Sequence, residues 1–251
     1  MTRFIKPLNA VLGIGLLIGI WHLATSTGLV GKIYLPLPSA AVDALIWGFR
    51  EGDLGEQTLQ TAVRMMWGWL LASLIGVALG SLMGVWARGE IYLGPTLEFI
   101  RPLPASAIVP VAIVFFGLTP GMVVGVIAFG SLWPTLLATV HGFSSVEARL
   151  KEVAKVLGLS KLSFVFKIGL PNAVPDILAG MKLSMTVALI LAIVGEMLTG
   201  QPGLGTAILL AGRSYQSADL FAGIIVLGVI GLVSNALLQK CEVYLLRWRH
   251  S

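Results

Sequence analysis

Residues 152–171, EVAKVLGLSKLSFVFKIGLP, form a short basic stretch between two strongly apolar segments. Charged and apolar residues at helical spacing run up to Gly158, and a second short helix is predicted between this glycine and Pro171, which closes it. Four lysines in or beside the stretch make it positive: Lys151, Lys155, Lys161 and Lys167. A polar helix–turn–helix between membrane segments has the chemistry of a docking surface for another protein.

Signals for catalysis are missing from the sequence. It contains no G-x-x-x-x-G-K-[ST], so the chain is not expected to bind ATP through a Walker loop. His22, His141 and His250 have neither the spacing of a zinc motif nor a nearby nucleophile. An intramembrane hydrolase is therefore disfavoured. We expect a chain that is not itself an enzyme and that holds no metal or cofactor.

Basic residues in or near the apolar segments are candidates for lining a transport path. Arg101 and Lys182 would add positive potential to the inner mouth of an anion path. A structural interpretation competes with this one. Glu98 and Arg101 lie three residues apart and can pair on one helix face, and Lys182 can extend toward the cytoplasmic interface. The sequence leaves both interpretations open.

Other polar residues in the apolar segments are weaker path candidates. A carboxylate in an anion's path would repel it, which favours a helix-terminal or gate-stabilising role for Glu196. The hydroxyls of Ser184 and Thr186 either face the path or bond to their own helix, and the second is the commoner use. Asp176, just after Pro175, is predicted to complement the positive N-terminal end of its helix.

The composition defines the elements that must position these residues. Of 251 residues, 57% are hydrophobic and only 12% are charged, which is too apolar for a soluble domain. We expect one transmembrane domain over residues 1–251. Cys241 is the lone cysteine and cannot form an intrachain disulfide. The basic residues behind the net charge of +5 lie in a few loops, so membrane topology explains this charge better than nucleic-acid binding does.

Apolar runs predict an all-α fold with about six transmembrane helices. The third run is broken by Pro102, Pro104 and Pro110, and the fourth contains Pro134. The predicted spans are residues 8–23, 62–87, 97–117, 122–140, 177–198 and 220–238, the last continuing to about 246. In the second span, small residues from Ala78 to Gly84 indicate close helix packing. The first span could be a cleaved signal peptide, but its apolar run is longer than a typical signal core.

The distribution of Lys and Arg orients the chain. With six spans both ends lie on one side, which then holds eleven of the seventeen basic residues, against three on the other. The eleven are Arg3, Lys6, Arg88, Arg149, Lys151, Lys155, Lys161, Lys167, Lys240, Arg247 and Arg249, and the three are Lys32, Arg50 and Arg213. By the positive-inside rule, both termini and the basic loop are cytoplasmic. Arg64, Arg101 and Lys182 lie inside or near spans and stay unassigned.

Two connections on the opposite side have recognisable patterns. Residues 33–39, IYLPLPS, predict an extended entry with Ser39 as the N-cap of a helix over about 40–49, which would lie at the membrane interface. Residues 199–205, TGQPGLG, precede an apolar run over 206–211 that is too short to cross a bilayer. That run is predicted to be re-entrant or interfacial.

The basic loop fits the pattern E-x-A, three residues, Gly, nine residues, I-x-L-P. This spacing resembles the cytoplasmic "EAA" loop of permease subunits of bacterial ABC importers, with Val153 replacing the usual alanine. LPLP at 35–38, RPLP at 101–104 and GLG at 203–205 are similar to the nitrate, sulfonate, taurine and bicarbonate branch. The resemblance covers nearly the whole chain. The residues it assigns to coupling with an ATPase are Glu152, Ala154, Gly158, Leu159, Ile168, Leu170 and Pro171.

The resemblance implies a type I importer fold in the bacterial inner membrane and a set of partners. These are a second copy of the chain, two ATP-binding subunits that hold ATP and Mg²⁺, and a periplasmic or lipid-anchored binding protein. ATP-driven closure of the ATPase pair would move the loop, within about residues 144–171, and import a small anion such as a sulfonate, taurine or nitrate. The alternative is a secondary transporter or channel without an ATPase, which leaves the basic loop without a purpose.

Overall fold

The computed structural model describes the backbone of residues 2–247 and the side chains of residues 12–86, 91–92 and 94–247. Arg249 and His250 lie outside the described residues, as do the side chains of Arg3, Lys6 and Arg88. The described chain is helical. Its elements are α1 (Thr2–Ser26), α2 (Pro38–Arg50), α3 (Leu54–Val85), α4 (Ala87–Ile100), α5 (Ala105–Phe116), α6 (Pro120–Ser144), α7 (Ala148–Val156), α8 (Lys161–Phe164), the π-helix η1 (Val165–Gly169), α9 (Leu170–Thr199), α10 (Leu204–Arg213) and α11 (Ser217–Leu245).

Four helices in the described part are long and apolar enough to cross a membrane, namely α3, α6, α11 and the continuous stretch Lys161–Thr199 that ends with α9. A bent pair, Gly94–Ile100 and Ala105–Phe116, makes a fifth if it counts as one span. The two halves meet at 92° because Pro102 and Pro104 interrupt the helix between them. The first of the six predicted spans corresponds to α1. The part of α1 whose side chains are described, Leu12–Ser26, is apolar but shorter than the four long helices.

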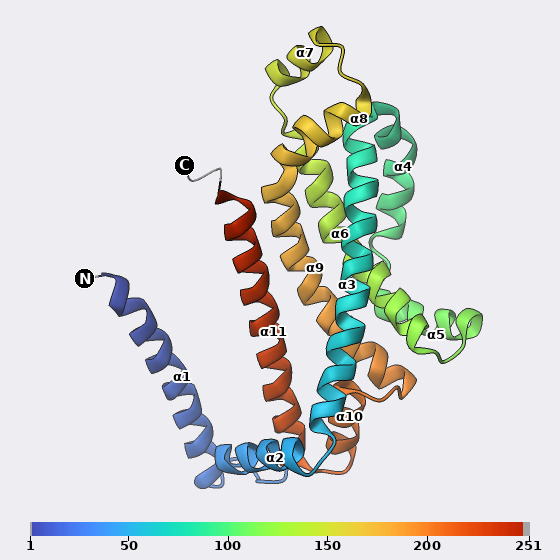
Figure 1. Cartoon of the computed structure of the whole chain (residues 1–251). Helices are drawn as coiled ribbons and strands as arrows, with labels where there is room; N and C mark the ends of the chain where they lie inside the picture. Colours follow the sequence, from blue (N-terminus) through green and yellow to red (C-terminus); the bar gives the residue numbers. More distant parts are fainter. Residues whose placement is uncertain (1, 248–251) are drawn as a thin grey trace. The chain divides into compact units, whose positions relative to one another are not determined.

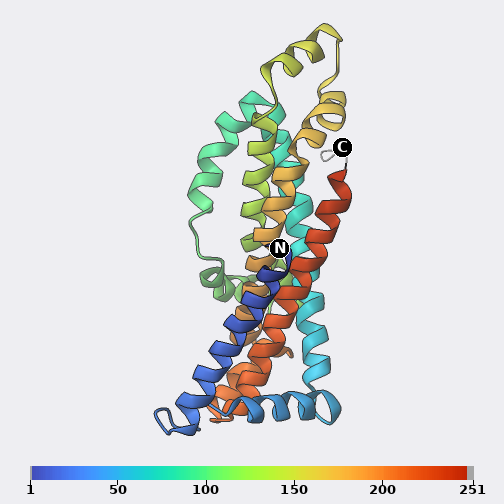
Figure 2. The ribbon, with the colours of Figure 1, turned by 90° about the vertical axis from the view of Figure 1, so that its left-hand side faces the viewer.

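The larger of two compact units comprises residues 61–201 and 229–251. Its centre is the pair α6 and α9, which run side by side (Figures 1 and 2). The residue Gly80 brings α3 close to α6, since a Cβ there would lie 2.6 Å from the Cβ of Thr139 and 2.9 Å from the carbonyl oxygen of Leu136. This contact confirms the close packing predicted from the small residues at 78–84.

The smaller unit comprises residues 1–60 and 202–228. The Trp21 indole of α1 donates a hydrogen bond to the Pro36 carbonyl oxygen at 2.8 Å, and its ring centroid lies 5.2 Å from that of Phe221. The helix predicted at 40–49 is α2, but Ser39 is not its N-cap. Leu37 occupies the N-cap position without a side-chain capping bond, and Pro38 lies in the first turn, where a proline loses no helical hydrogen bond. The short apolar run is α10, of ten residues.

Candidate coupling loop and intramembrane polar sites

Gly158 ends α7 as the sequence predicts, in the left-handed conformation with φ +59°. Its N–H donates to the Lys155 carbonyl oxygen at 3.1 Å, and the N–H of Leu159 donates to that of Ala154 at 3.0 Å. This pair of bonds is a Schellman motif, which turns the chain sharply after a helix. A Cβ at residue 158 would meet nothing within 4 Å, so the backbone angle, not space, calls for glycine.

We call α7 and α8 with the turn between them the α7–α8 loop (residues 148–164). It protrudes beyond the ends of α6 and α9 (Figure 1). Ala154 is its buried residue in α7, while the side chain of Glu152 is exposed. Apolar side chains are exposed beside the charges, with Val156 at 87% and Leu157 at 68%. An exposed surface that mixes apolar and basic side chains is suited to contact with another protein.

The second half of the loop returns to the bundle through α8 and η1. The Ser160 hydroxyl caps α8 by accepting a hydrogen bond from the Ser163 N–H at 3.2 Å. Leu170 packs against a buried cluster formed by Phe143, Ala173 and Ile177. Of the remaining residues assigned to coupling, Ile168 lies half-buried in η1 and Pro171 is exposed.

Two expectations about this return segment are wrong. Pro171 does not close a helix but lies in the first turn of α9, where its missing N–H costs no bond. Asp176 does not sit at a helix N-terminus, because α9 begins at Leu170 and contains Pro175. Sequence analysis assigned no role to Asn172. Its side-chain amide donates to the Gly142 carbonyl oxygen at 3.0 Å and to the Ser145 hydroxyl at 3.2 Å, which joins the two ends of the loop.

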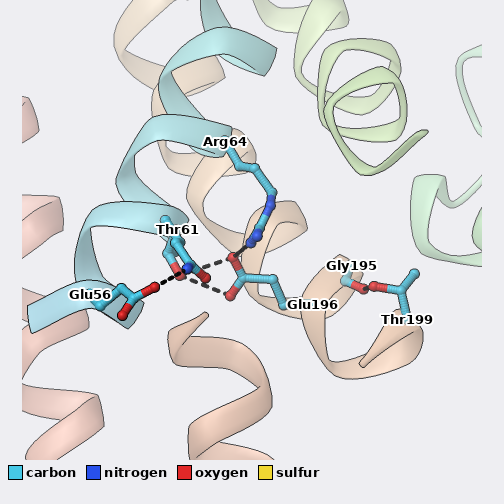
Figure 3. A network of polar contacts seen from close by, with 7 residues as sticks. Glu56, Thr61, Arg64, Gly195, Glu196 and Thr199 are labelled. Carbon is cyan, nitrogen blue, oxygen red and sulfur yellow. Dashed lines mark hydrogen bonds and ion pairs between the residues drawn. The ribbon is translucent and has the colours of Figure 1, made fainter. Parts of the chain in front are cut away.

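Glu196 is fully buried and is held by two residues of α3 (Figure 3). The Thr61 hydroxyl lies 2.9 Å from both carboxylate oxygens, and the Arg64 guanidinium forms an ion pair with the carboxylate. We call these three residues the Glu196 site. Sequence analysis left Arg64 unassigned and did not single out Thr61. The available signal was an arginine in an apolar span, because an intramembrane charge requires a partner.

Lys182 and the two hydroxyl residues near it bond to protein groups. Lys182 pairs with Glu242 of α11. The Ser184 hydroxyl donates to the Ser131 carbonyl oxygen of α6 and not to its own helix. The Thr186 hydroxyl bonds weakly back to the Lys182 carbonyl oxygen, at 3.4 Å.

Arg101 lies apart from these groups, after the last turn of α4. Among the described residues, no ion pair joins it to Glu98. Its exposed side chain instead lines an open cavity of about 630 Å³ together with residues of α6 and α9. Lys182 does not line this cavity. The two basic path candidates therefore have different surroundings, one beside a cavity and one in an ion pair.

Known proteins resemble this chain along most of its length. The sequence profile of the family "Binding-protein-dependent transport system inner membrane component" matches residues 72–242. A putative aliphatic sulfonates transport permease of Bacillus subtilis is 33% identical, over 94% of this chain and 85% of that protein. A nitrate import permease of Leptolyngbya laminosa is 31% identical over 88% and 81%. A bicarbonate transport system permease of Synechococcus elongatus is 28% identical over 99% and 90%.

Among solved structures, an inward-facing form of the MetNI methionine ABC transporter matches with a TM-score of 0.65 at 18% identity. The match covers 77% of this chain and 94% of that one. This likeness shows the fold, that of a type I ABC importer permease. Apolar spans, fold and family profile agree on a multi-pass transport component of the inner membrane. The chain therefore belongs to the binding-protein-dependent transport system inner membrane components, in the branch of the sulfonate, nitrate and bicarbonate ABC permeases.

Proposed function

We propose that this chain is the membrane-spanning subunit of an ATP-driven importer, and that its α7–α8 loop couples it to an ATP-binding subunit. The observation that carries the proposal is the exposed loop, shaped by the left-handed Gly158 and joined at its base by Asn172. A segment that presents apolar and basic side chains, yet is fixed at both ends, can transmit a push from a partner into α6 and α9. Membership of the family supports this role.

Two substitutions in the loop test the coupling role. Gly158→Val forces a β-branched residue into the left-handed region at about 1–3 kcal/mol, so the loop should no longer seat in its partner. Glu152→Ala removes an exposed carboxylate from α7 and should weaken the coupling of ATP hydrolysis to uptake. Each variant is reconstituted in proteoliposomes with the ATPase and binding protein, and hydrolysis, uptake and ATPase co-purification are measured.

Controls separate coupling from folding. Gly158→Asn should keep most of the uptake, because asparagine adopts the left-handed conformation more readily than valine. Lys240→Gln changes an exposed basic residue of α11 outside the loop and should leave all three readouts unchanged. Normal uptake by both Gly158→Val and Glu152→Ala, with the ATPase still bound, would mean that the loop only connects α6 and α9.

We propose that the working assembly holds two copies of this chain, two ATP-binding subunits and an external binding protein, with both termini of the chain cytoplasmic. Family membership and the exposed loop support this. Native mass spectrometry of the purified complex should find two copies of the chain, and the complex should hydrolyse ATP. A second, different permease would contradict the homodimer. Transport by a complex with no ATPase would favour a secondary transporter or channel.

We propose a small anion as the solute. The named relatives are permeases for sulfonates, nitrate and bicarbonate, which share a negative charge. The exposed Arg101 beside a cavity agrees with an anion. Thermal-shift screening of the cognate binding protein against sulfonates, nitrate, bicarbonate, cations and sugars tests this proposal. Preferential stabilisation by a cation or an uncharged sugar would contradict it.

A further inference from the structure

The two ends of the α7–α8 loop meet at one buried aromatic ring. Phe143 lies in the last turn of α6, just before the loop, and is 1% exposed. It is the largest side chain that the described part of the chain buries to this extent. After the loop, the chain returns through η1, where the buried Gly169 faces the same ring. The residue before the loop and the residue after it therefore lie against each other.

Two glycines leave this ring no space to move. A Cβ at residue 169 would lie 2.2 Å from Cε1 of Phe143, and a Cβ at Gly84 of α3 would lie 2.3 Å from Cβ of Phe143. Gly169 has an ordinary helical φ of −62°, so the ring and not the backbone angle calls for glycine there. Close-packed interiors transmit displacement because they compress little. A shift of η1 should therefore reach α3 through Phe143.

The π-helix η1 brings both of its ends to the cluster that surrounds the ring. The Leu170 N–H donates to the carbonyl oxygen of Val165, five residues earlier, whereas an α-helix bonds residues four apart. Val165 and Leu170 both pack against the cluster of Phe143, Ala173 and Ile177. On an α-helix, residues five apart point about 140° away from each other. The wider turn places them on one face, and such π-turns are frequent at functional sites.

We propose that Phe143 is a positioning residue for transport, which passes movement of the α7–α8 loop to α3. The helices α6 and α9 adjoin the loop along the chain, whereas α3 does not and meets the ring through Gly84. This inference rests on the proposed function, in which an ATP-binding subunit holds the loop, and it adds the residue through which movement enters α3. The exposed loop side chains recognise the partner, and the buried ring transmits the movement.

The test follows α3 directly and needs no transported solute. Cys241→Ser removes the lone cysteine, and Leu82→Cys places a reporter thiol at an exposed position near the end of α3. Alkylation by N-ethylmaleimide is read as the mass shift of this chain in the reconstituted permease–ATPase complex, with and without ATP and vanadate. With Phe143 present, nucleotide should change the rate at least about threefold, the size expected of coupling between distant sites. An unchanged rate would overturn the proposal, because α3 would not follow the ATPase.

Phe143→Leu removes the ring and should reduce this response to less than about 1.5-fold. The ATPase should still co-purify, because the exposed loop side chains are unchanged. A ring that only filled the core would, when removed, lower the free energy of unfolding and leave the response to nucleotide intact. Phe143→Met keeps an apolar side chain of similar length but flexible shape, and should lose the response as well. It replaces the leucine variant if that one does not fold, and a full response in the variant that folds would overturn the proposal.

Ile127 offers a matched control on the same pair of helices. Its buried side chain meets Gly68 of α3 much as Phe143 meets Gly84, since a Cβ at residue 68 would lie 2.4 Å from Cγ2 of Ile127. It lies nearer the start of α6, away from the loop. Ile127→Ala should lower the free energy of unfolding through a cavity but keep the response at residue 82. Loss of the response in this variant too would mean that any packing defect abolishes it, and would overturn the special role of Phe143.

A double variant tests whether the ring and η1 act through one contact. Gly169→Ala presses a methyl group into Phe143 and should also weaken the response to nucleotide. Residues that act through a shared contact are not additive, so Phe143→Leu combined with Gly169→Ala should be no worse than the poorer single variant. Losses that multiply would show that the two residues act independently, and would contradict transmission through their contact.

Gly158→Val separates the failure of this inference from the failure of the proposed function. Gly158→Val should release the ATPase, whereas Phe143→Leu should retain it. If Phe143→Leu responds to nucleotide like the unaltered chain while Gly158→Val loses the ATPase, movement enters α3 by another route. This inference would then be wrong, and the coupling role of the loop would stand. Normal uptake by both Gly158→Val and Glu152→Ala would remove the coupling role and this inference with it.

Discussion

The α7–α8 loop and the Glu196 site both contain a carboxylate and basic side chains, but they handle charge in opposite ways. In the loop Glu152 is exposed, and Lys155 and Lys161 are exposed with it. In the Glu196 site the carboxylate is fully buried, and Thr61 and Arg64, which hold it, come from another helix. Water or a partner can solvate the loop charges, whereas the buried carboxylate depends on protein groups alone.

This difference indicates that the charges of the α7–α8 loop serve recognition of a partner, whereas those of the Glu196 site stabilise the fold. Exposed charges cost little to keep and are ready to contact another protein. A buried ion pair adds little net stability over an apolar pair, yet removing one member leaves the other without its countercharge. We therefore expect substitutions in the loop to change coupling more than folding, and substitutions in the Glu196 site to change folding first.

The largest effect is expected at the Glu196 site. Glu196→Ala removes the carboxylate that Arg64 faces and should destabilise the protein by about 3–5 kcal/mol, measured as denaturant unfolding in detergent. The double variant Arg64→Met, Glu196→Leu removes both charges at similar volume and should recover most of the stability. If the double variant is as unstable as the single one, the ion pair is not what the site depends on.

Gly80 and Gly158 are glycines for different reasons: a side chain at residue 80 would lack space, and a side chain at residue 158 would strain the backbone. Gly80→Ala places a Cβ against Thr139 and should cost about 1–3 kcal/mol through overpacking between α3 and α6. Gly158→Ala meets no neighbour and should cost about 1–2 kcal/mol through its left-handed angle. Gly80→Ala should lower the free energy of unfolding, whereas Gly158→Ala should mainly lower uptake and ATPase binding. If Gly158→Ala changed unfolding and Gly80→Ala changed only uptake and ATPase binding, the contrast between the two sites would be wrong.

A smaller effect is expected at the cap of α8. Ser160→Ala removes the acceptor for the Ser163 N–H and should cost about 1 kcal/mol of local helix stability. Limited proteolysis of the loop should speed up, while global unfolding stays close to wild type. Ser160→Asp preserves a capping oxygen and serves as the control. Equal proteolysis of the alanine and aspartate variants would show that the cap does not order this helix.

The smallest effect is expected for the pair between Lys182 and Glu242, whose side chains are each 28% exposed. Partial solvation weakens an ion pair, so Glu242→Gln should cost about 1 kcal/mol or less. The cost should shrink further at high salt, because exposed charges are screened. A loss comparable to that of Glu196→Ala would mean that this pair behaves as a buried one.

Local features were predictable because they depend on residues close in the chain. The apolar runs predicted α3, α6, α9 and α11, and the prolines between α4 and α5 predicted the break in the third span. The left-handed Gly158 followed from a helical pattern that stops at a glycine. Failures were also local: Ser39 was mistaken for a cap and Pro171 for a stop, since a proline is equally at home in a helix's first turn.

Long-range pairing was decided only by the tertiary structure. The sequence marked Glu196 and Arg64 as ionisable groups in apolar spans, but it did not show that these residues, 132 positions apart, form one buried pair. It likewise favoured a bond from the Ser184 hydroxyl to its own helix over a place in the path, whereas this hydroxyl donates to the Ser131 carbonyl oxygen of α6. Periodicity shows that a side chain lies within a span. Which other helix meets that side chain depends on the packing of α3, α6 and α9, because helices far apart in sequence find their contacts only when the bundle assembles.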